Sequence, residues 1–122
     1  LQAAFSETRT RMETRSAEAR GLVALRNAAL AELPLDEELR RSCEVRLGFW
    51  ARATADESFA ADQRARYFEL RRTFARLLEE AGTAGELRAD LDFEAEAERL
   101  VALCDGVAVQ ALFDGYRWTP EH

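Results

Sequence analysis

The segment from Leu100 to Phe113 constrains the fold of this chain more than any other segment. Every residue in it except Asp105 and Gln110 is nonpolar, so a helix formed here is apolar around its whole circumference. A helix of this kind lies either within a membrane or between packed surfaces on both sides. The segment is shorter than the roughly 20 residues that cross a bilayer, and it carries two polar residues. The sequence therefore predicts that a partner chain covers one side of this helix.

Glycine and proline, which interrupt helices, are sparse: the 122 residues include six Gly and two Pro. A chain of this length builds one hydrophobic core, and its pattern holds no strand signal or internal repeat. We therefore predict an all-α fold that forms a single domain over residues 1–122. Apolar periodicity near 3.6 residues predicts five helices, at about residues 1–15, 18–33, 37 onwards, 57–82 and 94–114.

The ends of these helices carry residues that favour helix starts and stops. Asp36 and Asp92 suit the caps of the third and fifth helices, because a short acidic side chain accepts hydrogen bonds from the first free backbone amides. Pro34 ends the second helix, since the residue before a proline is disfavoured in helical geometry. Gly82 is predicted to end the fourth helix in a left-handed conformation.

The third helix carries two apolar stripes, which predicts burial on two sides and a central position in the domain. Its main stripe consists of Leu39, Cys43, Leu47 and Trp50. Val45 and Phe49 form a second stripe, about 120° away if each residue turns the helix by about 100°.

Helical projection divides the fifth helix into two arcs. The bulkier arc is assigned to the core of the subunit: Leu100, Leu103, Val107, Ala111 and Phe113. The flatter arc has smaller side chains, which suit the close approach of another helix. We predict a two-fold homodimer in which the last two helices of each subunit form a four-helix bundle. The predicted interface residues come from the fourth and fifth helices: Phe68, Arg71, Ala75, Leu78, Val101, Cys104, Asp105, Ala108 and Leu112.

The charge of the chain argues against nucleic-acid binding by this segment itself. The formal net charge is −6, and acidic residues are spread along the whole length. DNA binding requires a clustered positive surface that neutralises phosphates. The same charge disfavours an anionic membrane surface, so we expect neither DNA nor a membrane as a direct partner.

The sequence offers no set of residues for catalysis. Its one histidine, His122, is the last residue, so we predict no enzymatic activity, no cofactor and no metal. Cys43 and Cys104 are interpreted as buried, reduced thiols. Asp105 is predicted to form an ion pair across the bundle, because an unpaired buried carboxylate is costly. The candidate partners are arginines of the fourth helix: Arg66, Arg71 and Arg72.

The chain has more large side chains than a short helical domain needs to fill its core. Gaps between helices are often lined by apolar and aromatic side chains with a few polar groups. Ordinary core packing accounts for any one of these residues, but as a group they predict a ligand cavity around the third helix. The predicted ligand-binding residues are Met12, Leu22, Leu25, Leu47, Phe49, Trp50, Tyr67 and Phe74.

Nearly the whole chain resembles the C-terminal domain of the TetR (tetracycline-repressor) family of transcriptional regulators, and most closely the betaine-regulator-like subgroup. The resemblance rests on "LPLDEELRRSCEVRLGFWARATADESF", "GELRADLDFEAEAERLVALCDGVAVQALFDG" and "TPE". Its most specific parts are "FWA" at residues 49–51 and "GELR" at residues 85–88, which leads to Asp105 and Gly106.

The resemblance implies a homodimeric regulator, a repressor in a bacterial cytoplasm, with a small-molecule effector pocket between its middle helices. It also implies an N-terminal helix-turn-helix domain that binds operator DNA, which this chain lacks. The alternative is a stand-alone helical dimerisation or adaptor module without a small-molecule ligand. A cavity beside Trp50 distinguishes the two, because an adaptor has a fully packed core there.

Overall fold

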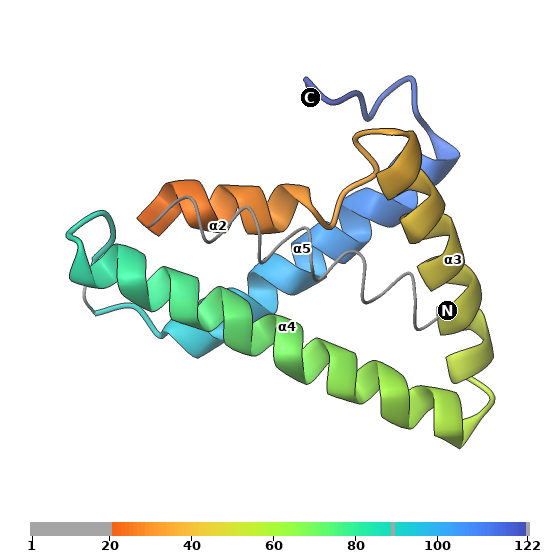
Figure 1. Cartoon of the computed structure of the whole chain (residues 1–122), viewed down its shortest axis with the longest axis horizontal. Coiled ribbons are helices and arrows are strands. Elements are labelled where there is room, and N and C mark those ends of the chain that lie inside the picture. Colours follow the sequence, from red (N-terminus) through yellow and green to blue (C-terminus); the bar gives the residue numbers. More distant parts are fainter. Residues whose placement is uncertain (1–20, 89, 122) are drawn as a thin grey trace.

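The chain forms an all-α domain (Figure 1). The computed structural model describes residues 21–88 and 90–121, and these hold four helices and no strand. The helices are α2 (Gly21–Leu30), α3 (Glu37–Ala53), α4 (Glu57–Thr83) and α5 (Phe93–Phe113). The predicted all-α fold class is therefore confirmed. The helix predicted at residues 1–15 lies outside the described residues. None of the described helices is both long and apolar enough to cross a membrane.

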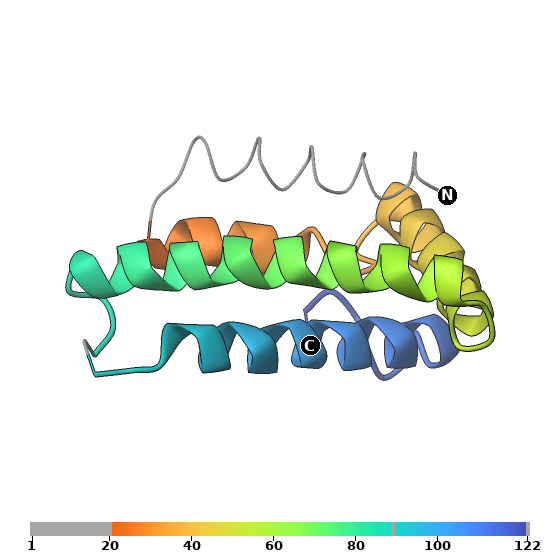
Figure 2. The same ribbon diagram turned by 90° about the horizontal axis from the view of Figure 1, so that it is seen from below.

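The long helix α4 is the centre of the domain. It contacts α2, α3 and α5. Helix α5 runs antiparallel to α4 in a second layer, and α3 crosses the end of the domain where α4 begins (Figure 2). The prediction that α3 is central is wrong, because α4 holds that position; the second stripe of α3 is buried at Phe49 (3% exposed) but not at Val45 (41% exposed).

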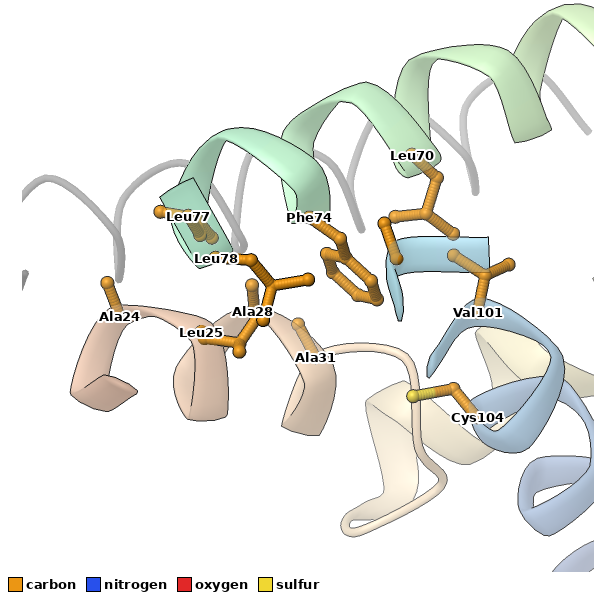
Figure 3. Packing of buried hydrophobic residues seen from close by; sticks show 11 residues of the cluster. Ala24, Leu25, Ala28, Ala31, Leu70, Phe74, Leu77, Leu78, Val101 and Cys104 are labelled. Atoms are coloured by element: carbon orange, nitrogen blue, oxygen red, sulfur yellow. The ribbon is translucent and has the colours of Figure 1, made fainter. Parts of the chain in front are cut away.

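The hydrophobic core lies between α2, α4 and α5 (Figure 3). Large side chains from α4, including the fully buried Phe74, fill its middle. Small residues on α2 and α5 let those helices approach α4 closely. The buried cluster consists of Ala24, Leu25, Ala28, Ala31, Leu70, Phe74, Leu77, Leu78, Ala97, Val101 and Cys104.

The two arcs of α5 divide differently from the sequence-based prediction: Ala111 of the bulkier arc is buried and Leu100 packs against the core as predicted, but the smaller arc is buried as well. The small residues Val101, Cys104 and Ala108 are buried inside the subunit, whereas Leu103 and Phe113 are 62% and 79% exposed. The reason is that small side chains suit any close helix crossing, and α5 uses them against its own chain. Leu78 is likewise buried in the core, so the interface prediction is wrong for these four buried residues.

The predicted acidic caps are present at the helix starts. The backbone N–H of Leu39 donates to Asp36 Oδ1 at 2.8 Å, and that of Ala95 donates to Asp92 Oδ1 at 3.1 Å. Each bond satisfies one of the backbone donors that the first helical turn leaves free.

The end of α4 differs in detail from the prediction. The N–H of Glu86 donates to the carbonyl of Ala81 at 2.9 Å, and that of Gly85 donates to the carbonyl of Gly82 at 3.1 Å. This bonding is a Schellman motif, in which Gly85 is the left-handed residue with a φ of 80°. Gly82 instead leaves room for the Phe93 ring, because a Cβ at Gly82 would lie 2.7 Å from Cζ of Phe93.

The turn after α4 also fixes the start of α2. The backbone N–H of Leu22 donates to Glu86 Oε1 at 3.2 Å. Gly21, which has a φ of 65°, lets this carboxylate approach, since a Cβ at Gly21 would lie 1.7 Å from Glu86 Oε1. At its other end α2 stops at Leu30, earlier than the predicted residue 33.

Replacing Gly85 with Ala should lower the free energy of unfolding by about 1 kcal/mol, because an L residue is strained at positive φ. The matched control is Gly48→Ala in the interior of α3, where an added Cβ meets nothing within 4 Å. That substitution should raise the free energy of unfolding by about 0.5–1 kcal/mol, since Ala favours helices over Gly. Urea titrations at one protein concentration measure both, and shifts of the same sign would contradict the assigned cap.

Candidate functional site

A buried ion cluster joins the segment after α2 to α3 and α4. Arg46 Nη1 forms a short ion pair with Glu32 Oε2, and Arg46 Nη2 donates to the Glu32 carbonyl at 3.0 Å. Arg66 Nη2 lies 3.1 Å from the same Oε2. Glu32 and Arg46 are only 2% and 3% exposed. One carboxylate therefore holds two guanidinium groups from two different helices in a buried setting.

Both cysteines are free and buried. The Cys43 thiol lies 3.6 Å from the Glu32 carbonyl, to which it donates, and accepts from Arg46 Nη2 at 3.0 Å. Burial raises the pKa of the Cys43 thiol, although the Arg46 charge opposes the shift. Burial also raises the pKa of Cys104 to about 12. Both side chains therefore stay as neutral thiols near pH 7.

Asp105 is bonded to a tyrosine rather than to an arginine. The Tyr67 hydroxyl donates a short hydrogen bond to Asp105 Oδ2. Loss of hydration raises the pKa of Asp105, and the bond from Tyr67 opposes that rise. Burial and the neighbouring Asp105 raise the pKa of Tyr67. The predicted ion pair is wrong because Arg66, one of its candidates, binds the buried Glu32 instead.

A shallow hollow of about 400 Å³ lies between α3 and the first half of α4 and is largely open to solvent. The rings of Trp50 and Tyr67 stack in its wall, with centroids 6.5 Å apart and planes 29° apart. Its volume falls within the range of small-molecule sites, which is about 300–1,000 Å³. The lining residues are Trp50, Ala53, Thr54, Ala60, Gln63, Arg64 and Tyr67.

Two of the lining residues also have a buried polar atom without a hydrogen-bond partner in the described part of the chain. These atoms are Trp50 Nε1, a donor, and Gln63 Oε1, an acceptor. An unsatisfied buried polar atom costs roughly 1–3 kcal/mol, so such atoms are rare in native structures.

Of the predicted ligand-binding residues, Trp50 and Tyr67 are the two that line this hollow. The others are spread over the domain. Leu25 and Phe74 belong to the core. Phe49 packs edge-on against Phe59, with ring centroids 5.1 Å apart. Leu47 is partly buried, and Leu22 is 39% exposed. Met12 lies outside the described residues.

A second hollow, of about 240 Å³, lies on the outer face of α4 and α5. It brings together the predicted interface residues Phe68, Arg71 and Ala75, and Phe68 is 53% exposed. Arg72 of α4 and two glutamates of α5, Glu94 and Glu98, complete its lining. The remaining predicted interface residue, Leu112, is partly buried, and its carbonyl accepts from Arg40 Nη2 at 3.2 Å.

Sequence reasoning missed three polar residues: Glu32 and Arg46, which are buried, and Gln63, which is partly buried. A signal for Arg46 was present, because it lies three residues after Cys43 and four before Trp50. This spacing places a charged residue on the apolar stripe of α3. A charge at such a position indicates a buried ion pair.

A family model described as BetI-type transcriptional repressor, C-terminal, matches residues 21–122. The match covers most of the chain, which therefore belongs to this family. The resemblance to the TetR family is thus confirmed, and the chain is a regulatory domain of the transcriptional-repressor type. A search of curated proteins found no match.

Replacing Glu32 with Gln should lower the free energy of unfolding by about 3–5 kcal/mol, because the buried Arg46 and the partly buried Arg66 lose their counter-charge. Glu57→Gln is the matched control, since Glu57 forms an exposed pair with Arg64. That change should cost less than about 1 kcal/mol. Chemical denaturation at a fixed protein concentration measures both, and equal effects would show that the cluster does not stabilise the fold.

Asp105→Asn should change how stability depends on pH. Because the folded pKa of Asp105 is raised, its contribution to stability is fully present below the ordinary value of 3.8 and is lost as pH rises through the raised value. Asn does not ionise, so the variant should gain stability relative to the native chain as pH rises toward 7. Denaturation at several pH values measures this difference. Asp62→Asn, at an exposed site, is the control. If the stability difference between Asp105→Asn and the native chain does not change with pH, the predicted effect is refuted.

Proposed function

We propose that this BetI-type domain is the effector-binding and dimerisation half of a one-component transcriptional repressor whose DNA binding is switched by a small molecule. The observation that carries the proposal is the arrangement of α4. One part of this helix lines the hollow beside Trp50, and its neighbouring outward face carries Phe68 and the second hollow. A ligand and a second copy of the chain can therefore act on the same helix.

The outer face of α4 and α5 supports a homodimer. Phe68 exposes a large apolar surface beside the second hollow, and Leu103 exposes another elsewhere on α5. Gly106 is also exposed, and a Cβ added to it would meet nothing within 4 Å. Glycine inside a helix costs about 1 kcal/mol relative to alanine, so its use here suits the close approach of a partner helix.

The charges of the second hollow are complementary to one another. Arg71 and Arg72 of α4 lie in the same hollow as Glu94 and Glu98 of α5. In a two-fold interface the same patch meets itself, so the arginines of one subunit can face the glutamates of the other. This pairing supports a four-helix bundle built from α4 and α5 of both subunits.

The hollow beside Trp50 favours a sensor over the alternative of a fully packed adaptor module. Tyr67 lines the hollow, and its neighbour Phe68 lies on the proposed dimer face. A ligand that binds one arrangement of α4 more tightly would shift the population of dimer geometries. The spacing of two DNA-binding heads would change with it.

DNA contact is assigned to a helix-turn-helix segment outside these 122 residues, because the chain itself has a net charge of −6. The proposed protein acts in the cytoplasm on operator DNA, without a cofactor or catalytic activity. Its partners are a second copy of itself and a small-molecule effector.

Native mass spectrometry of the protein as purified from cells tests the proposed function. The expected result is a dimer, with additional mass from a bound small molecule when the effector has been retained. A dimer that stays free of added mass and binds no compound from a metabolite library would favour the adaptor. A monomer would reject the dimer.

Leu103→Arg should convert the dimer into a monomer, because it places a long charged side chain on the proposed interface. Sedimentation velocity measures the change, and circular dichroism checks that the helices are retained. Val45→Arg is the matched control, since Val45 is also exposed but lies on α3. An unchanged dimer for Leu103→Arg would mean that another face forms the interface.

A further inference from the structure

Four charged residues border the second hollow, on the outer face of α4 and α5. Arg71 and Arg72 come from α4, whereas Glu94 and Glu98 come from α5. Arg71 is partly buried and the other three are exposed, so a partner that covers this face meets charges of both signs. These four residues are called the charged quartet below.

The two signs are kept apart within one subunit. In the described part of the chain no ion pair joins either arginine of the quartet to either glutamate, although all four line one hollow of about 240 Å³. Arg72 instead lies over the Phe68 ring, with its guanidinium carbon 5.7 Å from the ring centroid. The face therefore has a positive edge on α4 and a negative edge on α5, and each edge is open to a partner of opposite charge.

A second copy of the chain can meet this face in two ways. In a crossed arrangement, α4 of one subunit lies against α5 of its partner, and a positive edge meets a negative edge twice. In a matched arrangement, α4 lies against α4, and like charges of the two subunits come together. Two-fold symmetry permits both arrangements, since the same patch meets itself in either case.

Apolar contact does not distinguish these two arrangements, but charge does. Phe68 and Ala75 line the same hollow and can bury apolar surface against either helix of a partner, because hydrophobic attraction has no direction. Like charges that face each other across an interface are strongly unfavourable, so charge fixes both the register and the choice of partner.

We propose that the charged quartet selects the partner and the register of the dimer. The chain pairs with a second copy of itself in the crossed arrangement, and it rejects a helical domain that carries one sign of charge on the whole face. Such selectivity comes from repulsion of the wrong partner as well as from attraction of the right one. The inference rests on the proposed function, since it names what determines partner choice at the proposed dimer face.

Three charge variants of the native chain test the proposal. The acidic variant is Arg71→Glu/Arg72→Glu, and the basic variant is Glu94→Arg/Glu98→Arg. The swapped variant combines all four substitutions. Native mass spectrometry of the separate variants and of their mixtures, over a range of concentrations, measures which dimers form, because the masses of the subunits differ.

The acidic and basic variants should each form a homodimer about 100-fold weaker than the native one, because each carries a single sign of charge on the whole face. When the two variants are mixed, they should form a heterodimer. The swapped variant should form a homodimer but no heterodimer with the native chain. The reason is that, in the crossed arrangement, the swapped α4 and the native α5 are both negative.

The matched control is Arg26→Glu/Arg41→Glu, which makes the same change in net charge as the acidic variant at exposed sites on α2 and α3. It should leave the dimer affinity within about threefold of the native value, because solvent and salt screen distant charges. Circular dichroism checks that each variant keeps its helices. If the basic or the swapped variant does not fold, the comparison of the acidic variant with the control decides.

Three results would overturn the inference: an acidic variant that dimerises as tightly as the control, folded acidic and basic variants that do not pair when mixed, or free mixing of the swapped and native chains. In each of these cases a dimer of the native chain would keep the proposed function. A native chain that stays monomeric would instead reject the proposed dimer and the inference together.

Discussion

The buried carboxylate of Glu32 is the constraint on which the rest of the structure depends. It follows α2 directly and holds Arg46 of α3 and Arg66 of α4, so it fixes three segments relative to one another. Hydrophobic packing alone tolerates sliding and rotation of helices, because apolar contacts have no direction. An ion pair with hydrogen bonds allows only a narrow range of positions. The buried cluster thus complements the core between α2, α4 and α5, which supplies most of the apolar burial.

The same helix α4 connects every functional feature of the domain. Arg66 belongs to the ion cluster, Tyr67 to the hollow and to the bond with Asp105, and Phe68 to the outer face. Consecutive residues on a helix point about 100° apart, so three neighbours can reach three different environments. A small rotation of α4 would alter all of them together. This arrangement is a physical basis for coupling a ligand to the geometry of a dimer.

The sequence was sufficient for the four described helices and their acidic caps, and insufficient for the ends of α2 and α4 and for the helix faces. Local signals such as Asp36 and Asp92 act within one turn, so a pattern identifies them without knowledge of the fold. The smaller arc of α5 was wrongly assigned to a partner, because the small residues around Ala108 suit a close crossing with α4 as well as one with a partner. Arg46 was missed because pattern reading assigns charged residues to solvent, and its partner Glu32 lies on a different element. The hollow was anticipated near Trp50, whereas Gln63 became visible only through its unpaired oxygen.

The contact between Gly21 and Glu86 has a consequence for how members of this family vary. The Glu86 carboxylate occupies the space that any side chain at position 21 would need, and it binds the first free amide of α2. A relative with a larger residue at position 21 must therefore carry a shorter or redirected side chain at position 86. It must also cap the start of α2 by another donor–acceptor pair. These two positions, far apart in the sequence, are expected to evolve as a pair.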